Sequence, residues 1–221
     1  MSEVALLVPS SGRQKLAERP YTWEELTEIV ETGSDLSLLA RSAEGERSYR
    51  AESRLLRSEW RSIGDYVLVD KFGFERQPVR LPVVAGTDAD ADEGGVGVGG
   101  VWEARPPLAN STATRVVLCP NDFPYYLPPH VTHWVLWKIN GSVTDADIER
   151  AEDDLKAGKV VWPLAGDANC CGGASGGGCS PRAVTATMHW VNPPHLKSLA
   201  EIDHAHILCL SGDAATDIER G

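Results

Sequence analysis

Two glycine-rich stretches divide this chain of 221 residues and limit where its core can form. Residues 87–100 read TDADADEGGVGVGG, and residues 170–179 read CCGGASGGGC. Neither stretch carries enough apolar surface to offset the entropy cost of ordering its backbone. We therefore expect flexible insertions over residues 82–112 and 164–182, and a core built from the sequence around them.

The segment before the first insertion carries the signals of α-helices. Residues 22–25, TWEE, form a capping box, in which the threonine and the second glutamate each satisfy a backbone amide. Gly33 closes this helix. The apolar spacing then predicts a second helix from about residue 42 to residue 62, and a further helical turn over residues 65–71 that follows Gly64.

The segment after the first insertion alternates strands with one helix. Runs rich in β-branched and aromatic residues predict strands over residues 114–118, 133–139, 160–162, 184–191 and 204–210. Residues 145–157 form an amphipathic helix that Thr144 can cap.

These elements predict an α+β fold, with N-terminal helices packed on a mostly antiparallel sheet and one crossover helix. Short connections between the later strands favour antiparallel pairing. We expect a single domain over residues 20–210, with a helical part at 20–75 and a sheet part at 113–210. Residues 1–19 are expected to be a flexible N-terminus and residues 211–221 a tail.

The charge of the chain narrows the classes of partner. Lys and Arg number 21 against 32 Asp and Glu, so the formal net charge is −11. Such a chain repels phosphate backbones, which argues against nucleic acid and anionic membranes as partners. The first 80 residues are nearly balanced, with 12 basic and 14 acidic side chains, so they can still offer local positive charge.

The cysteines and the hydropathy pattern bear on location. Five cysteines without regular spacing fit a reducing compartment better than a disulfide framework. No apolar run approaches the ~18 residues that a membrane span needs. We expect a cytoplasmic protein, with the nucleus as the alternative location.

Paired histidines mark the strand-like segment at residues 201–210. His204 and His206 alternate with apolar residues, so they share one face of a strand at a separation of about 7 Å. Glu201 and Asp203 precede them. Neighbouring imidazoles beside carboxylates suit phosphate chemistry or metal ligation.

Three further clusters carry polar side chains near the ends of predicted strands. Residues 120–125 read PNDFPY, and Asn121 and Asp122 can cap a turn there. In residues 133–138, HWVLWK, the alternation places His133 on one face and Lys138 on the other. The third cluster, VNPPHLKS, is a turn-rich bridge into the histidine strand.

Taken in order, these motifs resemble the fungal N-acetylglucosamine-induced protein 1 family, a domain of unknown function. The matching segments are residues 22–26, 41–42, 63–68, 121–125, 133–138, 196–198 and 204–207. Phe123 stands where that family has tryptophan, and the two insertions are particular to this chain. The resemblance implies an intracellular protein linked to the response to amino sugars.

The second half of the chain also resembles histidine-triad nucleotide-binding proteins in the order of its motifs. In those proteins the middle histidine of the closing strand attacks an α-phosphate. The resemblance implies that His206 is the nucleophile, that His204 is its neighbour, and that Lys197 and Ser198 contact phosphate. Leu208 stands where the third histidine of that pattern belongs.

Three hypotheses for function follow. The first is a protein that binds, and in one version hydrolyses or transfers, a phosphate ester such as a nucleotide or nucleotide sugar, with His206 and His204 as catalytic residues. The residues expected to contact that ligand are Asn121, Asp122, Tyr125, His133, Lys138, Asn192, Lys197 and Ser198.

The second hypothesis is a non-catalytic regulatory or scaffold protein of sugar metabolism that binds a protein partner. The third is a metalloprotein, in which His204 and His206, with His133 or Asp122, hold a divalent metal. We expect no other cofactor.

Overall fold

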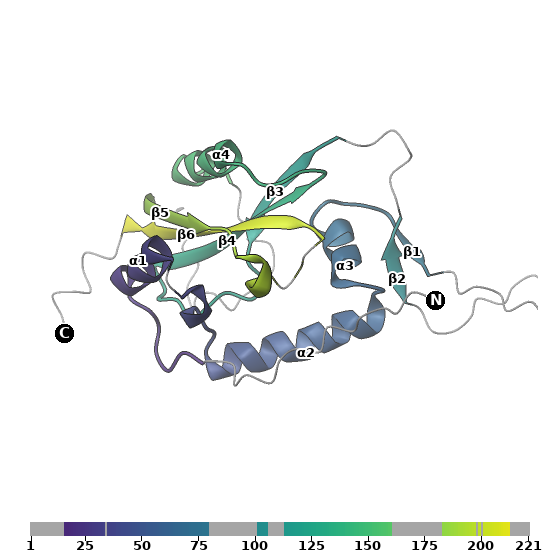
Figure 1. Ribbon diagram of the computed structural model, residues 1–221, viewed down its shortest axis with the longest axis horizontal. Coiled ribbons are helices and arrows are strands. Elements are labelled where there is room, and N and C mark those ends of the chain that lie inside the picture. The colour runs from purple at the N-terminus through teal and green to yellow at the C-terminus, as the bar shows by residue number, and fades with distance from the viewer. Residues whose placement is uncertain are drawn as a thin grey trace, which may run out of the picture.

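A four-stranded sheet lies between two helical layers, with α4 on one face and the N-terminal helices on the other (Figure 1). This arrangement confirms the expected α+β class. The computed structural model describes residues 16–33, 35–79, 101–105, 113–160, 183–197, 199 and 201–212. The two glycine-rich stretches, residues 87–100 and 170–179, lie outside these ranges.

The first helix has the predicted caps. α1 (Trp23–Thr32) begins with Thr22, whose side chain accepts from the Glu25 amide while the Glu25 carboxylate accepts from the Thr22 amide. It ends at Gly33, whose φ of 56° lies in the left-handed region that glycine adopts without strain. A short 3₁₀ helix, η1 (Leu36–Leu38), follows.

The next two helices differ from the sequence prediction in their ends. α2 (Ala43–Glu59) stops before residue 62, because Trp60 is extended and bridges to Trp102. α3 (Ile63–Asp70) begins after its cap, Ser62, so Gly64 lies inside the helix instead of before it. A Cβ at Gly64 would lie 3.0 Å from Oε2 of Glu201 and 3.4 Å from Oγ of Ser62.

The sheet has the strand order β3-β4-β6-β5, and every neighbouring pair is antiparallel. Its strands are β3 (Arg115–Pro120), β4 (Val131–Ile139), β5 (Val184–Trp190) and β6 (Asp203–Ser211). α4 (Asp145–Lys156) lies in the crossover from β4 to β5 and passes over β6. Val160, expected to start a short strand, is a bend, and residues 161–162 lie outside the described ranges.

The alternation of side chains along β4 and β6 builds a separate core on each face. Trp134, Leu136 and Ile207 pack against α4. On the opposite face, Leu208 packs with residues of α1, and a third cluster around Phe72 joins α3 to the sheet. His204 and His206 share this opposite face with Leu208, because they are two and four residues from it.

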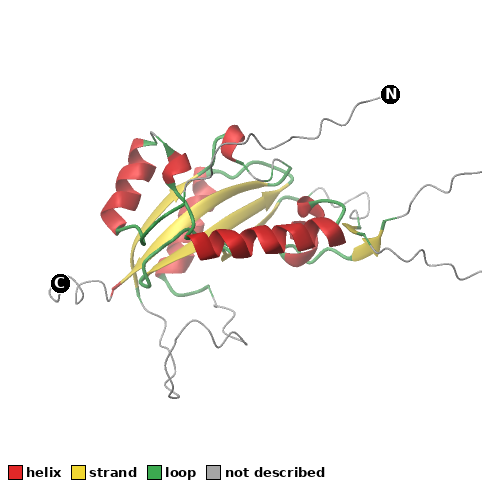
Figure 2. Cartoon of the chain, turned by 90° about the horizontal axis from the view of Figure 1, so that it is seen from below, coloured by secondary structure: helices red, strands yellow, loops and turns green. Residues whose placement is uncertain are grey.

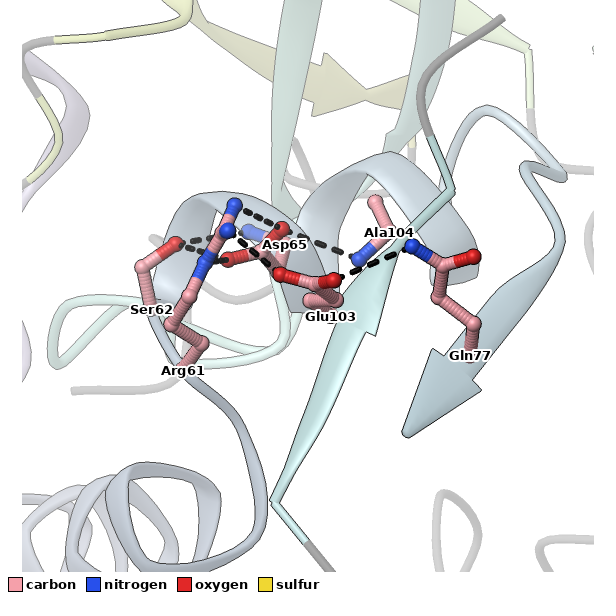
Figure 3. Close-up of polar contacts among 6 residues, drawn as sticks. All are labelled: Arg61, Ser62, Asp65, Gln77, Glu103 and Ala104. Atoms are coloured by element: carbon pink, nitrogen blue, oxygen red, sulfur yellow. Dashed lines mark hydrogen bonds and ion pairs between the residues drawn. The ribbon is translucent and has the colours of Figure 1, made fainter. Parts of the chain in front are cut away.

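A small hairpin beside α3 was not predicted. Its strands are β1 (Arg76–Pro78) and β2 (Trp102–Ala104), so residues 101–105 are ordered although they fall within the expected flexible insertion. The physical reason is a polar clamp around Asp65 of α3, whose carboxylate accepts from the Ala104 amide at 2.9 Å (Figure 3). Arg61 adds ion pairs to Asp65 and to Glu103.

The ends of the domain extend slightly beyond the expected limits. The amide of Ala17 donates to the Arg41 carbonyl, so part of the expected flexible N-terminus is held to the helical layer. At the other end, Ser211 belongs to β6 and the amide of Gly212 donates to the Ala183 carbonyl. The short 3₁₀ helix η2 (Pro194–Leu196) leads towards β6. Among the helices of the described ranges, none is both long enough and apolar enough to cross a membrane.

Candidate functional site

A cavity of about 370 Å³ lies between the sheet and the N-terminal helices. Its floor includes His204, His206 and Trp137, which project from β6 and β4. Arg41 and Tyr49 line it from the helical layer. Seen from the helical side, α2 crosses in front of part of the sheet (Figure 2), and its residues Ser53 and Leu56 also line the cavity.

His204 presents one ring nitrogen without a partner. Its Nδ1 lies 3.1 Å from the carbonyl oxygen of Ile202, and because a carbonyl only accepts, Nδ1 carries the proton. In the neutral ring Nε2 then holds a lone pair, and it makes no hydrogen bond to another described residue. The ring packs against Trp137 with centroids 4.7 Å apart. His204 is therefore the open basic group of the cavity.

His206, in contrast, has both ring nitrogens engaged. The Trp190 indole donates to Oδ1 of Asn192 at 3.1 Å, which turns the amide so that its Nδ2 donates to Nε2 of His206 at 3.0 Å. The proton of His206 must then be on Nδ1, which donates to Nε2 of His133 at 3.0 Å. The chain of bonds fixes the ring and leaves it no free nitrogen.

The residues of the predicted turn at 120–125 complete this network. Oδ1 of Asn121 accepts from the Phe123 amide at 2.9 Å, so its Nδ2 is directed at the His133 ring, 3.2 Å from both nitrogens. Tyr125 stacks on the same ring with centroids 5.0 Å apart. The turn therefore positions His133, which in turn holds His206.

Burial keeps the three histidines neutral. It lowers the pKa of His206 to about 3, and the neighbouring His204 and Arg41 act in the same direction. Burial, His206 and Arg41 hold the pKa of His133 well below its usual value, and burial also lowers the pKa of His204. The floor of the cavity is therefore uncharged, and Nε2 of His204 can accept a hydrogen bond there.

Two cations line the cavity beside these rings. The Arg41 guanidinium lies 4.0 Å from the Tyr49 ring centroid, donates to the Phe123 carbonyl, and pairs with Glu46 at 3.3 Å. Lys71 pairs with Asp122 at 2.9 Å; burial opposes its charge, but the bond to Asp122 raises its pKa. The cavity thus combines neutral imidazoles with two cationic side chains, Arg41 and Lys71, that ion pairs keep in place.

Several predicted ligand contacts do not reach the cavity. Lys138 lies on the opposite face of the sheet, where it pairs with Asp147 at 2.6 Å at the start of α4. Lys197 pairs with Asp203 at 2.5 Å and does not line the cavity. Ser198 lies outside the described residues. Of the predicted contacts, Asn121, Asp122, Tyr125 and Asn192 line the cavity, and His133 supports it from behind.

Sequence reasoning did not select Arg41, Lys71 or Trp190. Arg41 belongs to one of the segments that carry the family resemblance, so a signal for it was present. Lys71 and Trp190 have no comparable signal, because their roles depend on which strands and helices meet. Trp137 packs against the core cluster around Phe72 and also lines the cavity.

The residues that the metalloprotein hypothesis needs are not arranged as ligands. Within the described ranges, no group of three His, Cys, Asp or Glu side chains is placed to hold a metal ion. The hydrogen bonds explain why, since the ring nitrogens of His206 already bond to His133 and Asn192.

The fold and the cavity define an α+β domain with a buried histidine–asparagine network beneath a helical layer. The chain belongs to the family described as Protein of unknown function (DUF3605), whose model matches residues 22–159. That match includes Arg41, Asn121 and His133 but ends before β6.

Two individual proteins are also similar. The chain is 28% identical over 193 residues to "Uncharacterized protein YPL067C" of Saccharomyces cerevisiae, covering 85% of this chain and 78% of the yeast protein. It is 23% identical to the chain solved as "Crystal Structure of HTC1", with a TM-score of 0.46 and coverage of 89% of each chain.

Proposed function

We propose that this protein binds a small phosphate ester in the cavity, with His204 as the group that meets the ligand or its attacking water. The observation that carries the proposal is the unpartnered Nε2 of His204, which lies in a cavity that Arg41 and Lys71 also line. Cationic side chains attract phosphate oxygens, and a neutral imidazole can accept the proton of a hydroxyl group or a water.

The role of His206 differs from the one that the histidine-triad resemblance implies. Its two nitrogens are held by His133 and Asn192, so attack on phosphorus would require breaking one of these buried bonds. His204 needs no such change. In a hydrolytic version of the proposal, Nε2 of His204 takes a proton from water as its oxygen bonds to phosphorus. The P–O bond to the leaving alcohol breaks, and the alcohol takes the proton that His204 accepted, which returns the ring to its neutral form.

The family resemblance suggests which ligands to test first. It links the chain to the response to amino sugars, so amino-sugar phosphates and nucleotide sugars belong in the panel together with simple nucleotides. A ligand present at 100 times its dissociation constant stabilises a fold by about 2.7 kcal/mol. For a chain of this size that corresponds to a rise in melting temperature of about 5–10 °C.

The test is a thermal-shift screen of the wild type, His204→Ala and the control His189→Ala. His189 lies on the α4 side of the sheet, where it contacts Glu152, so its loss leaves the cavity intact. We expect a shift in the wild type and in His189→Ala that is absent in His204→Ala, with circular dichroism confirming that the variant is folded. Equal shifts in all three proteins, or none with any phosphate ester, would overturn the proposal and favour a regulatory scaffold.

A further inference from the structure

Arginines gather on one side of α2. At about 100° per residue, Arg47, Arg50, Arg54 and Arg57 fall within an arc of about 80° along about 15 Å of the helix axis. All four are exposed. We call these four residues the arginine stripe. The exposed Glu52 and Glu59 point to a different side of the helix by the same count, whereas Glu46 lies beside the arc and neutralises part of it through Arg50.

Three of the four members of the stripe have no counter-ion among the residues that the structure describes. Arg50 pairs with Glu46 at 2.7 Å. The guanidinium groups of Arg47, Arg54 and Arg57 make no ion pair or hydrogen bond with any other residue that the structure describes. In a protein of formal net charge −11, Arg54 and Arg57, which lie on adjacent turns without a counter-ion among the described residues, form a local positive charge that favours an anionic ligand.

The stripe continues the wall of the cavity. Tyr49, Ser53 and Arg57 of α2 all line the cavity, and Arg57 belongs both to this wall and to the stripe. Arg54 is its neighbour one turn earlier, and side chains three residues apart on a helix lie side by side. Arg57 therefore offers a guanidinium group at the cavity wall, and Arg54 offers a second one on the adjacent turn.

We propose that the ligand of this cavity is a pyrophosphate ester, such as a nucleoside diphosphate or a derivative of one, rather than a phosphate monoester. Arg57 and Arg54 contact the second phosphate group, and the remainder of the ligand extends towards His204. This proposal rests on the proposed function and makes it more specific. Arginine suits the role because its planar guanidinium group donates two parallel hydrogen bonds to phosphate oxygens.

The experiment is titration calorimetry with inorganic phosphate, pyrophosphate, AMP, ADP, UMP and UDP. The proteins are the full-length wild type, Arg57→Gln, Arg54→Gln and the matched control Arg47→Gln. All three variants remove one exposed positive charge from the same helix, but Arg47 lies about 15 Å from Arg57 along the axis. We expect the wild type to bind the diphosphates about tenfold more tightly than the monophosphates.

Arg57→Gln and Arg54→Gln should each reduce that preference about threefold to tenfold, and Arg47→Gln should leave it unchanged. Equal affinity of the wild type for mono- and diphosphates would overturn the proposal. If Arg47→Gln reduced the preference for diphosphates as much as Arg57→Gln does, the proposal would also be overturned. That result would show that the overall positive charge of the helix, and not a direct contact with the ligand, sets the preference.

The two proposals fail in distinguishable ways. If monophosphates and diphosphates bind equally and His204→Ala removes both, the phosphate-ester function stands and the pyrophosphate preference is wrong. If none of the six compounds binds the wild type, the pyrophosphate proposal is wrong, and the phosphate-ester function is wrong as well if the amino-sugar phosphates and nucleotide sugars of the thermal-shift screen also give no shift.

Discussion

Two clusters of buried polar side chains lie on the helical side of this protein, and they are built differently. In the clamp beside α3, the Asp65 carboxylate accepts from Ser62 at 2.7 Å, from Arg61 at 3.1 Å and from the Ala104 amide (Figure 3). Burial opposes the charge of Asp65, but these three donors outweigh it and lower its pKa. In the cavity, neutral imidazoles and amides bond to one another instead.

The difference indicates that the clamp is a structural cluster and that the cavity is a candidate binding site. The clamp satisfies its carboxylate completely and joins the β1–β2 hairpin to α3, which is sufficient reason for its residues. In the cavity, His204 lies beside the network without a hydrogen bond to it: among the described residues it bonds only through Nδ1 to the Ile202 carbonyl, and it lines a space of about 370 Å³. Nε2 of His204 can therefore accept a hydrogen bond from a molecule in that space, whereas the Asp65 carboxylate has no such capacity left.

The largest expected effect comes from removing the centre of the clamp. Asp65→Ala leaves the Ala104 amide and the Arg61 guanidinium without their acceptor, and we expect a loss of about 2–4 kcal/mol in the free energy of unfolding. Urea denaturation measures it. The exposed Asp153→Ala on α4 is the control and should change stability by less than about 0.5 kcal/mol. A small loss in Asp65→Ala would mean that the clamp is not a structural cluster.

His206→Ala tests whether the cavity network also contributes to the free energy of unfolding. The change leaves buried nitrogens of His133 and Asn192 unpaired, so we expect a loss of about 2–3 kcal/mol in urea denaturation. His204→Ala should cost less, because it removes one hydrogen bond to a carbonyl. If His204→Ala were the more destabilising of the two, His204 would belong to the structural network and the contrast drawn above would be lost.

Stability should fall on mild acidification. The pKa of His206 is about 3 in the folded protein and about 6.5 when unfolded, so between these values the unfolded chain binds the extra proton. The contribution of His206 to the free energy of unfolding is complete above about pH 6.5. It decreases as the pH falls, and at pH 5 about 2 kcal/mol is lost through this residue alone. His133 and His204 act in the same direction. Urea titrations from pH 7 to 5 measure the slope.

The matched variant isolates the contribution of His206. His206→Ala should show a shallower slope than the wild type over the same range, whereas the lowered pKa of Asp65 matters only below about pH 4. An identical slope in both proteins would assign the acid sensitivity to other groups.

The smallest effect is expected for Lys138→Met. Lys138 lies on the α4 face, so its loss removes the ion pair to Asp147 at a cost of about 1 kcal/mol and leaves the affinity for any cavity ligand unchanged. The pair also explains why the pKa of Asp147 is about 2, since Lys138 is its strongest influence. A tenfold loss of ligand affinity in this variant would indicate that the ligand binds on the α4 face of the sheet, and it would contradict the proposed site in the cavity.

Local signals in the sequence predicted much of the fold. The caps at Thr22, Gly33 and Thr144 and the alternation in β4 and β6 are local patterns, and the structure confirms the elements that they predicted. The same alternation separates His133 from Lys138, so the sequence already argued against placing both in one site. The end of α2 at Glu59 was missed because Trp60 pairs with a residue 42 positions later.

The contacts of the site depend on pairing that no local pattern contains. His133 meets His206 because β4 and β6 pair with Val135 opposite His206, a register between segments about 70 residues apart. Nε2 of His204 is left open because Nδ1 bonds to the carbonyl of Ile202, just before the start of β6, and no sequence pattern predicts that bond. The proposed role of Arg54 and Arg57 depends on the packing of α2 against the cavity, which no local pattern predicts.

The position of β6 has a consequence for how the chain folds. β6 comes latest in sequence among the described strands, yet it lies between β4 and β5 and supplies both histidines of the cavity floor. Before residues 203–211 leave the ribosome, β4 and β5 have no neighbour on their inner edges, and the apolar residues that pack on β6 stay open to solvent. Such long-range pairing slows folding and favours aggregation of incomplete chains. A chain shortened to residue 200 should therefore be captured by chaperones instead of forming a smaller version of the domain.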